Sequence, residues 1–108
     1  MNSAIKVITP EGILDGTKAT EFRSEIDRSV KEGASIILVD FSNVTFMDSS
    51  GLGALVLALK TVRSADKKMV LCSINEQIKM LFELTSMDRI FEILENKEEF
   101  EQKFCSKS

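Results

Sequence analysis

The chain has 108 residues, of which 44% are hydrophobic and 29% are charged, and its formal net charge at neutral pH is -3. This length and composition indicate a single folded domain over residues 1–108, and exclude a disordered chain. Lysines and arginines are scattered, without a basic stripe and interleaved aromatic residues, which argues against nucleic acid as a partner.

The first third of the chain predicts two short strands and one helix. Residues Ala4 to Thr9 alternate apolar and polar side chains, and a turn with proline and glycine leads into Gly12 to Leu14. This pattern predicts a hairpin at a sheet edge. Between Thr17 and Lys31 apolar residues recur at helical spacing, and Gly33 follows as a natural stop.

The middle of the chain predicts two buried strands with a helix between them. Ser35 to Phe41 and Met69 to Ile74 are continuous apolar runs, typical of parallel strands that are buried on both faces. Gly51 to Ala65 has one apolar face at helical spacing, formed by Leu52, Leu55, Val56, Leu59 and Val62.

The last third of the chain continues the alternation. Asn75 would cap a short helix, Arg89 to Leu94 is a short strand, and Phe100 with Phe104, one turn apart, marks a final helix. Strands that alternate with helices imply crossover connections. The predicted fold class is therefore α/β, with a small mixed β-sheet of four to five strands covered by about four helices.

Cysteine usage and apolar runs predict the compartment. Cys72 and Cys105 lack CxxC spacing and are expected to be reduced thiols. No apolar run reaches transmembrane length, and residues 1–9 lack the features of a signal peptide. We expect a cytoplasmic protein without a membrane partner, metal or cofactor. It should be monomeric alone, because no long apolar edge or heptad is visible.

The stretch VTFMDSSGLGALV, residues 44–56, places an acid, two hydroxyls and two glycines where a strand gives way to a helix. A nucleophilic serine would need G-x-S-x-G and a histidine base, but Met47 stands two residues before Ser49 and the chain has no histidine. A nucleotide-binding loop would need a third glycine or a P-loop motif. Both interpretations are therefore disfavoured, and we expect that the protein is not an enzyme. Weak binding of a nucleotide is still compatible with the sequence, because the N-terminus of any helix attracts phosphate.

The third interpretation is a serine that is itself modified and lies on a docking surface. Ser49 and Ser50 lie where the first N–H groups of a helix lack partners, so a hydroxyl there is a good cap, and capping alone could explain both. Gly51 and Gly53 each lower helix stability by roughly 0.5–1 kcal/mol relative to alanine, which a close approach from outside the domain would explain. Leu57, opposite the apolar face, would suit a docking patch.

The segment MDSSGLG, residues 47–53, resembles the phosphorylation site of STAS (sulfate transporter and anti-sigma factor antagonist) domains in bacterial anti-sigma factor antagonists. The similarity extends through EGILDG at 11–16 and IILVDFSNVTF at 36–46 to residues 67–93. The resemblance implies a STAS-like fold that binds an ATP-dependent serine kinase, which is also the anti-sigma factor, and so frees the sigma factor. Phosphorylation would block rebinding, and a PP2C-type phosphatase would restore the active form.

The same resemblance assigns roles to residues. Ser49, directly after the aspartate, would be phosphorylated, with Ser50 as its neighbour and the cap. The resemblance and the docking-patch argument together predict the residues that bind the partner. These are Asp15, Asp48, Ser50, Gly51, Leu52, Gly53 and Leu57. The alternative is a constitutive STAS scaffold subunit of a larger signalling assembly, or of a partner-switching circuit that does not act on a sigma factor.

Overall fold

The computed structural model describes residues 5–105 and contains two parallel sheets. The main sheet has the strand order β1-β3-β5-β6, with β1 at Ile5–Ile8, β3 at Ile36–Asp40, β5 at Lys68–Cys72 and β6 at Glu92–Leu94. A two-stranded sheet pairs β2 (Gly12–Leu14) with β4 (Val44–Met47). The predicted α/β class is confirmed.

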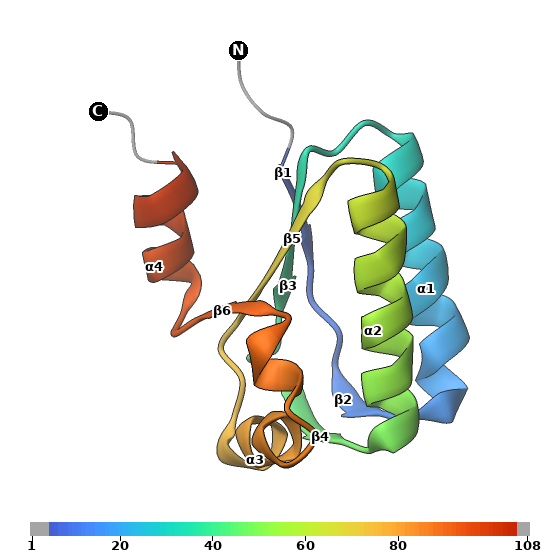
Figure 1. Ribbon diagram of the computed structural model, residues 1–108, viewed down its shortest axis with the longest axis vertical. Coiled ribbons are helices and arrows are strands. Elements are labelled where there is room, and N and C mark those ends of the chain that lie inside the picture. Colours follow the sequence, from blue (N-terminus) through green and yellow to red (C-terminus); the bar gives the residue numbers. More distant parts are fainter. Residues whose placement is uncertain (1–4, 106–108) are drawn as a thin grey trace.

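Helices cover both faces of the main sheet (Figure 1). On one face α1 (Gly16–Lys31) and α2 (Ser49–Ser64) lie side by side. On the other face lies α4 (Lys97–Phe100), which continues into a π-helical turn, η2 (Glu101–Cys105). At the lower end of the molecule in Figure 1 lies α3 (Glu76–Leu84), followed by a 3-10 turn, η1 (Met87–Arg89).

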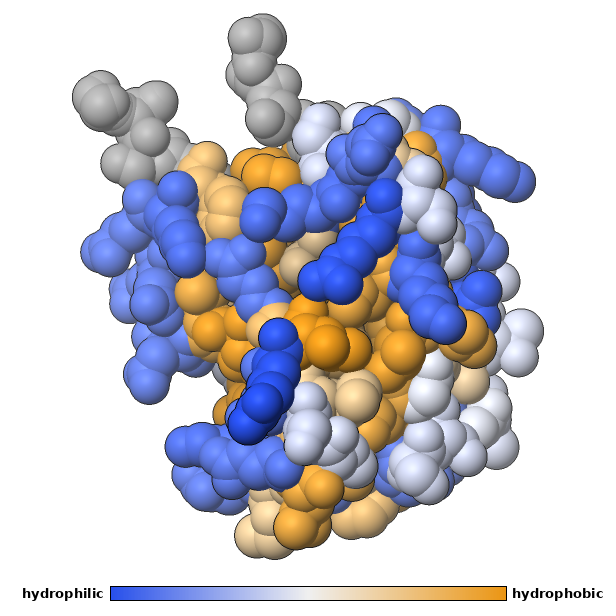
Figure 2. Space-filling model, in the orientation of Figure 1, coloured by the Kyte–Doolittle hydropathy of each residue, from blue (hydrophilic) through white to orange (hydrophobic). Residues whose placement is uncertain are grey.

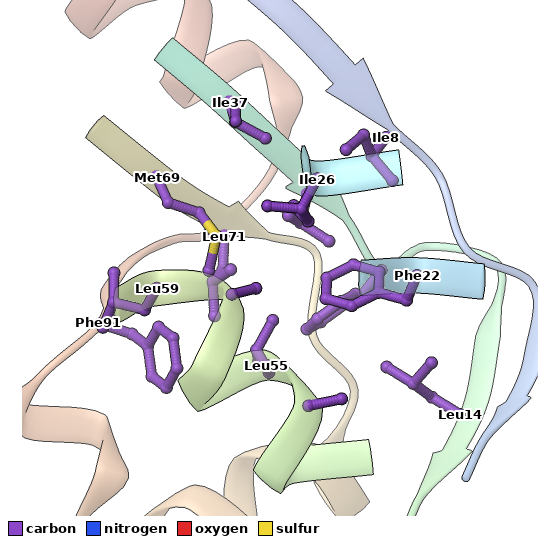
Figure 3. Packing of buried hydrophobic residues seen from close by; sticks show 14 of the residues in the cluster. Ile8, Leu14, Phe22, Ile26, Ile37, Leu55, Leu59, Met69, Leu71 and Phe91 are labelled. Carbon is purple, nitrogen blue, oxygen red and sulfur yellow. The ribbon is translucent and has the colours of Figure 1, made fainter. Parts of the chain in front are cut away.

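Each central strand has four successive apolar residues because its alternate side chains enter two different cores. Ile37 and Val39 of β3 belong to the larger core beneath α1 and α2, whereas Leu38 between them belongs to the smaller core beneath α4. In Figure 3, Phe22 of α1 and Leu55 of α2 both point into the larger core. The continuous apolar pattern thus gave the correct fold class.

The predicted N-terminal hairpin is wrong. Within residues 5–105, β1 pairs with β3 and β2 pairs with β4, and both pairings are parallel. The turn at Gly12, whose φ is 74°, therefore carries the chain from the main sheet into the smaller one. A turn between two apolar segments can belong to a hairpin or to a bend that leads from one sheet into another. Only the pairing of each strand with distant parts of the chain distinguishes the two. Ala4, where the hairpin was predicted to begin, lies outside the described residues.

Several element boundaries differ from the sequence patterns. The strand predicted at Met69 to Ile74 begins at Lys68 and ends at Cys72, because Ser73 adopts a left-handed backbone with φ of 62°. The helix predicted from Gly51 begins at Ser49. A final helix was predicted correctly, and the rings of Phe100 and Phe104 lie 5.0 Å apart between centroids.

Candidate functional site

The two strands of the smaller sheet end at the same level, and each leads through an aspartate into a helix. The last residues of β2 and β4 stand opposite each other in register. Asp15 follows β2 and accepts a hydrogen bond from the backbone N–H of Thr17 at 3.0 Å. Asp48 follows β4 and accepts one from the N–H of Gly51 at 2.9 Å. The pairing of the strands therefore brings the N-termini of α1 and α2 side by side.

The cap of α2 is Asp48, so the predicted cap at Ser50 is wrong. Asp48 has an extended backbone, with φ of -106° and ψ of -176°, whereas Ser49 and Ser50 are the first two residues of the helix. Both serines are exposed, and neither hydroxyl makes a hydrogen bond to any other part of residues 5–105. A carboxylate thus performs the capping, which leaves the hydroxyl of Ser49 without a structural task.

Gly51 is required by packing within the domain, whereas the sequence pattern favoured a close approach from outside the domain. A Cβ atom at this position would overlap the carbonyl oxygen of Leu14 and lie 3.2 Å from Cγ of Met47. A Cβ atom at Gly53 would meet no atom within 4 Å. The expectation of an external contact therefore applies only to Gly53, which is exposed.

Asp15 places a second carboxylate beside the start of α2. The hydroxyl of Thr17 donates to Asp15 Oδ1 at 2.6 Å, and this hydrogen bond lowers the pKa of the Asp15 carboxyl below its ordinary value. Asp15 is therefore ionised at neutral pH. The edge formed by the two helix N-termini is acidic before any modification takes place.

A shallow hollow of about 930 Å³ extends from Ser49 across α2. Small residues of α1 and α2 leave this space, and they include Ala19, Thr20, Ser50, Gly53 and Ala54. Larger side chains border it, including Arg23, Leu57 and Met87. In Figure 2 the surface over the lower half of α2 is mostly white to orange, whereas strongly hydrophilic residues lie toward its upper end. The shape and chemistry suit contact with a protein.

The predicted site residues divide between this surface and the interior. Ser49, Ser50, Gly53 and Leu57 line the hollow, and Leu57 is 47% exposed, as its position opposite the apolar face predicted. Leu52 also borders the hollow, but it is only 6% exposed and packs mainly in the core.

Sequence reasoning missed the residues that α1 and η1 add to this surface. Arg23 and Met87 line the hollow, but they lie far from the serine motif in sequence. No pattern in the chain links either residue to that motif. Only the packing of the helices brings them together.

Among the residues that the structure describes, no three histidine, cysteine, aspartate or glutamate side chains are placed to share a metal ion. The helices between residues 5 and 105 are all too short or too polar to span a bilayer.

A sequence profile of the STAS domain matches residues 2–100. The chain belongs to the STAS domain family. An anti-sigma-B factor antagonist of Listeria monocytogenes is 34% identical over 83 residues, which are 76% of this chain and 72% of that protein. One of Staphylococcus epidermidis is 30% identical over 106 residues, which are 91% of this chain and 98% of that protein.

Solved structures of an anti-sigma factor antagonist share the fold. The anti-sigma factor antagonist SpoIIAA in its unphosphorylated form has a TM-score of 0.79 and 17% identity, covering 100% of this chain and 95% of its own. The Bacillus cell fate determinant SpoIIAA in the phosphorylated form has a TM-score of 0.70 and 18% identity, covering 94% of this chain and 93% of its own. At these identities the likeness concerns the fold alone.

Proposed function

We propose that this STAS domain is a non-enzymatic anti-sigma factor antagonist, and that phosphorylation of Ser49 releases its partner, an anti-sigma serine kinase. The names of the Listeria and Staphylococcus relatives support the antagonist role. The observation that supports the switch is the position of Ser49, which is exposed, free of capping and at the edge of the hollow.

Exposure of Ser49 suits a reversible cycle in the cytoplasm. A kinase that transfers phosphate from ATP needs access to the hydroxyl, and a PP2C-type phosphatase needs the same access to remove it. Ser49 offers that access at the first residue of α2, where the helix begins beyond the edge of the small sheet. No part of the fold has to open for either reaction.

The fold should tolerate the phosphate. A phosphoserine adds about -1.5 to -2 charges. At the first residue of α2 this charge lies at the positive end of the helix dipole, which stabilises a negative charge by roughly 0.3–1 kcal/mol. This gain offsets repulsion from the capping Asp48, so the isolated domain should keep its stability.

The complex should not tolerate the phosphate. A partner that fills the hollow removes Ser49 from water, and a dianion buried there needs a cation. Of the residues that line the hollow, Arg23 is the basic one, and Asp27 lies one helical turn further along the same surface. Repulsion between the phosphate and the carboxylates of Asp15 and Asp48 also grows when a partner excludes water, because the effective dielectric constant falls. Desolvation and repulsion therefore oppose binding while the domain beneath is unchanged.

Substitutions at Ser49 test the switch. We expect Ser49→Asp to weaken binding to the kinase by about tenfold or more while the free energy of unfolding stays within about 1 kcal/mol. We expect Ser49→Ala to bind like the unmodified chain and to resist ATP-dependent release. Calorimetric titration gives the affinity, and urea denaturation gives the stability.

Intact-mass measurement after incubation with the kinase and ATP completes the test. The wild-type chain should gain one phosphate and Ser49→Ala none, whereas Ser50→Ala should still gain one. A Ser49→Asp chain that unfolds, or that binds as tightly as wild type, contradicts the mechanism. A wild-type chain that binds the kinase but gains no phosphate would identify the constitutive scaffold instead.

A further inference from the structure

The side chain of Gln77, on α3 (Glu76–Leu84), binds the backbone of Met47, the last residue of β4 and the first of the MDSSGLG segment. Gln77 Oε1 accepts a hydrogen bond from the N–H of Met47 at 2.9 Å, and Gln77 Nε2 donates one to the carbonyl oxygen of Met47 at 2.8 Å. The two bonds together fix the orientation of the amide, because exchanging its oxygen and nitrogen would break both.

This contact replaces a neighbouring strand. One edge of β4 pairs with β2, and Gln77 binds the other edge at Met47. Asn75 continues the same edge, since its Nδ2 donates to the carbonyl oxygens of Val44 and Thr45, each at 3.2 Å. The N-terminal part of α3 thus satisfies backbone groups of β4 that a two-stranded sheet leaves without partners.

The position of Ser49 depends on this edge. Met47 is fully buried, Asp48 follows it and caps α2, and Ser49 is the next residue. The bond to Gln77 is therefore two residues from the serine, with no flexible segment between them. Movement of the Met47 peptide would displace the Asp48 carboxylate from the N–H of Gly51 and change the direction of the first turn.

We propose that Gln77 is a positioning residue for Ser49, which holds the end of β4 so that the serine hydroxyl is presented in one geometry to the kinase. This inference rests on the proposed phosphorylation of Ser49. It adds α3 to the switch, an element that the serine motif does not include. Gln77 itself contacts the backbone of β4 and acts on the reaction through it.

Gln77→Ala tests the inference by kinetics. We expect kcat/KM for phosphorylation of Ser49 to fall by about tenfold, because a misplaced acceptor loses the orientation that the transfer requires. Gln77→Glu keeps the acceptor for the Met47 N–H but sets a carboxylate oxygen against the Met47 carbonyl oxygen, so it should also slow phosphorylation. It replaces the alanine variant if that variant does not fold. The kinase used in this assay is the one that phosphorylates the wild-type chain.

The matched control is Asn96→Ala. Asn96 caps α4 by accepting from the N–H of Glu99 at 2.8 Å, so its loss removes a different hydrogen bond between a side-chain amide and the backbone, on the opposite face of the sheet. Phosphorylation of this variant should stay within about twofold of wild type. If Gln77→Ala is phosphorylated as fast as wild type, or if Asn96→Ala is slowed equally, the inference is overturned while phosphorylation of Ser49 stands.

Hydrogen exchange separates this inference from the proposed function. In Gln77→Ala the N–H of Met47 loses its partner directly, so its faster exchange decides nothing. The N–H of Gly51 should also exchange about tenfold faster, because its bond to Asp48 is disturbed only through the strand. An unchanged rate at Gly51 refutes the positioning role. If the wild-type chain gains no phosphate, the proposed function fails, and the exchange at Gly51 still decides whether Gln77 orders this turn.

Discussion

At the scale of single residues, the two glycines that flank Leu52 have opposite structural roles. Gly51 faces the backbone of β2, where a Cβ atom would overlap the carbonyl oxygen of Leu14. Gly53 faces open space in the first turns of the same helix. From sequence both look like the same departure from good helix formers, and only the position of β2 distinguishes them.

Alanine at each glycine tests this difference. We expect Gly51→Ala to destabilise the domain by about 2–3 kcal/mol, because helix and strand must move apart. We expect Gly53→Ala to stabilise it by roughly 0.5–1 kcal/mol, because alanine costs less backbone entropy in a helix. The added methyl group would also protrude into the hollow and lower the affinity for the kinase. Urea denaturation of both variants checks the stabilities, and equal changes would contradict the geometry.

Residue patterns also limit what the sequence can predict about caps. Asn75 stands alone before its helix, was predicted as its cap, and accepts from the N–H of Ile78 at 2.9 Å. Around the start of α2 the chain has Asp48, Ser49 and Ser50 in a row, and aspartate and serine are both good caps. The choice among them depends on where β4 ends, which its pairing with β2 determines. The same long-range pairing decided against the predicted hairpin.

At the scale of elements, a shared ion pair joins the last helix to the sheet. Glu92 of β6 binds Lys68 of β5 at 3.1 Å and Lys103 of η2 at 2.9 Å. The hydrogen bond from Lys103 and, more weakly, that from Lys68 lower the pKa of Glu92 below its ordinary value of 4.5. The bond to Glu92 in turn raises the pKa of Lys103 above 10.5.

These shifts define the pH range in which the pairs stabilise the domain. Glu92 is a stronger acid in the folded chain, so its contribution is present above pH 4.5 and is lost as the pH falls through the folded pKa below that value. Lys103 is a weaker acid in the folded chain, so its contribution is present below pH 10.5 and is lost as the pH rises further. Both lysines are about half exposed, at 52% and 55% of the side chain, so each pair contributes little.

Replacement of Glu92 measures how much its two ion pairs contribute to the free energy of unfolding. At about pH 7, Glu92→Gln should lower the free energy of unfolding by less than about 1 kcal/mol, and this difference from wild type should shrink at about pH 3. High salt at neutral pH should reduce it as well. Glu95→Gln is the control, because Glu95 is exposed and forms no ion pair within residues 5–105. A difference from wild type that grows on acidification would refute the assignment.

At the scale of the whole molecule, the sheet separates two cores with different coverings. The larger core lies under α1 and α2, on the side that presents Ser49, and the smaller core lies under α4 and η2. Cys72 is fully buried in the smaller core, and burial raises the pKa of its thiol above the ordinary value. Both effects oppose reaction of this thiol with a reagent in solution.

Because the sheet separates the two cores, the reactivity of the Cys72 thiol reports the opening of the smaller core under α4 and η2. Phe100 of α4 is 2% exposed and closes the smaller core over Cys72. In a Cys105→Ser background, Phe100→Ala should destabilise the domain by about 3 kcal/mol and increase the rate of disulfide exchange at Cys72 with an aromatic disulfide reagent by about 100-fold.

Phe82→Ala is the matched comparison. Phe82 is also fully buried, but it packs on Phe91 in the larger core, with ring centroids 5.5 Å apart. If α4 opens without the rest of the fold, Phe82→Ala should raise the reactivity of Cys72 much less than Phe100→Ala does at equal loss of global stability. Equal rates in the two variants would mean that the faces open only together. Because Ser49 lies on the other face, the phosphomimetic Ser49→Asp should leave the Cys72 rate unchanged in either case.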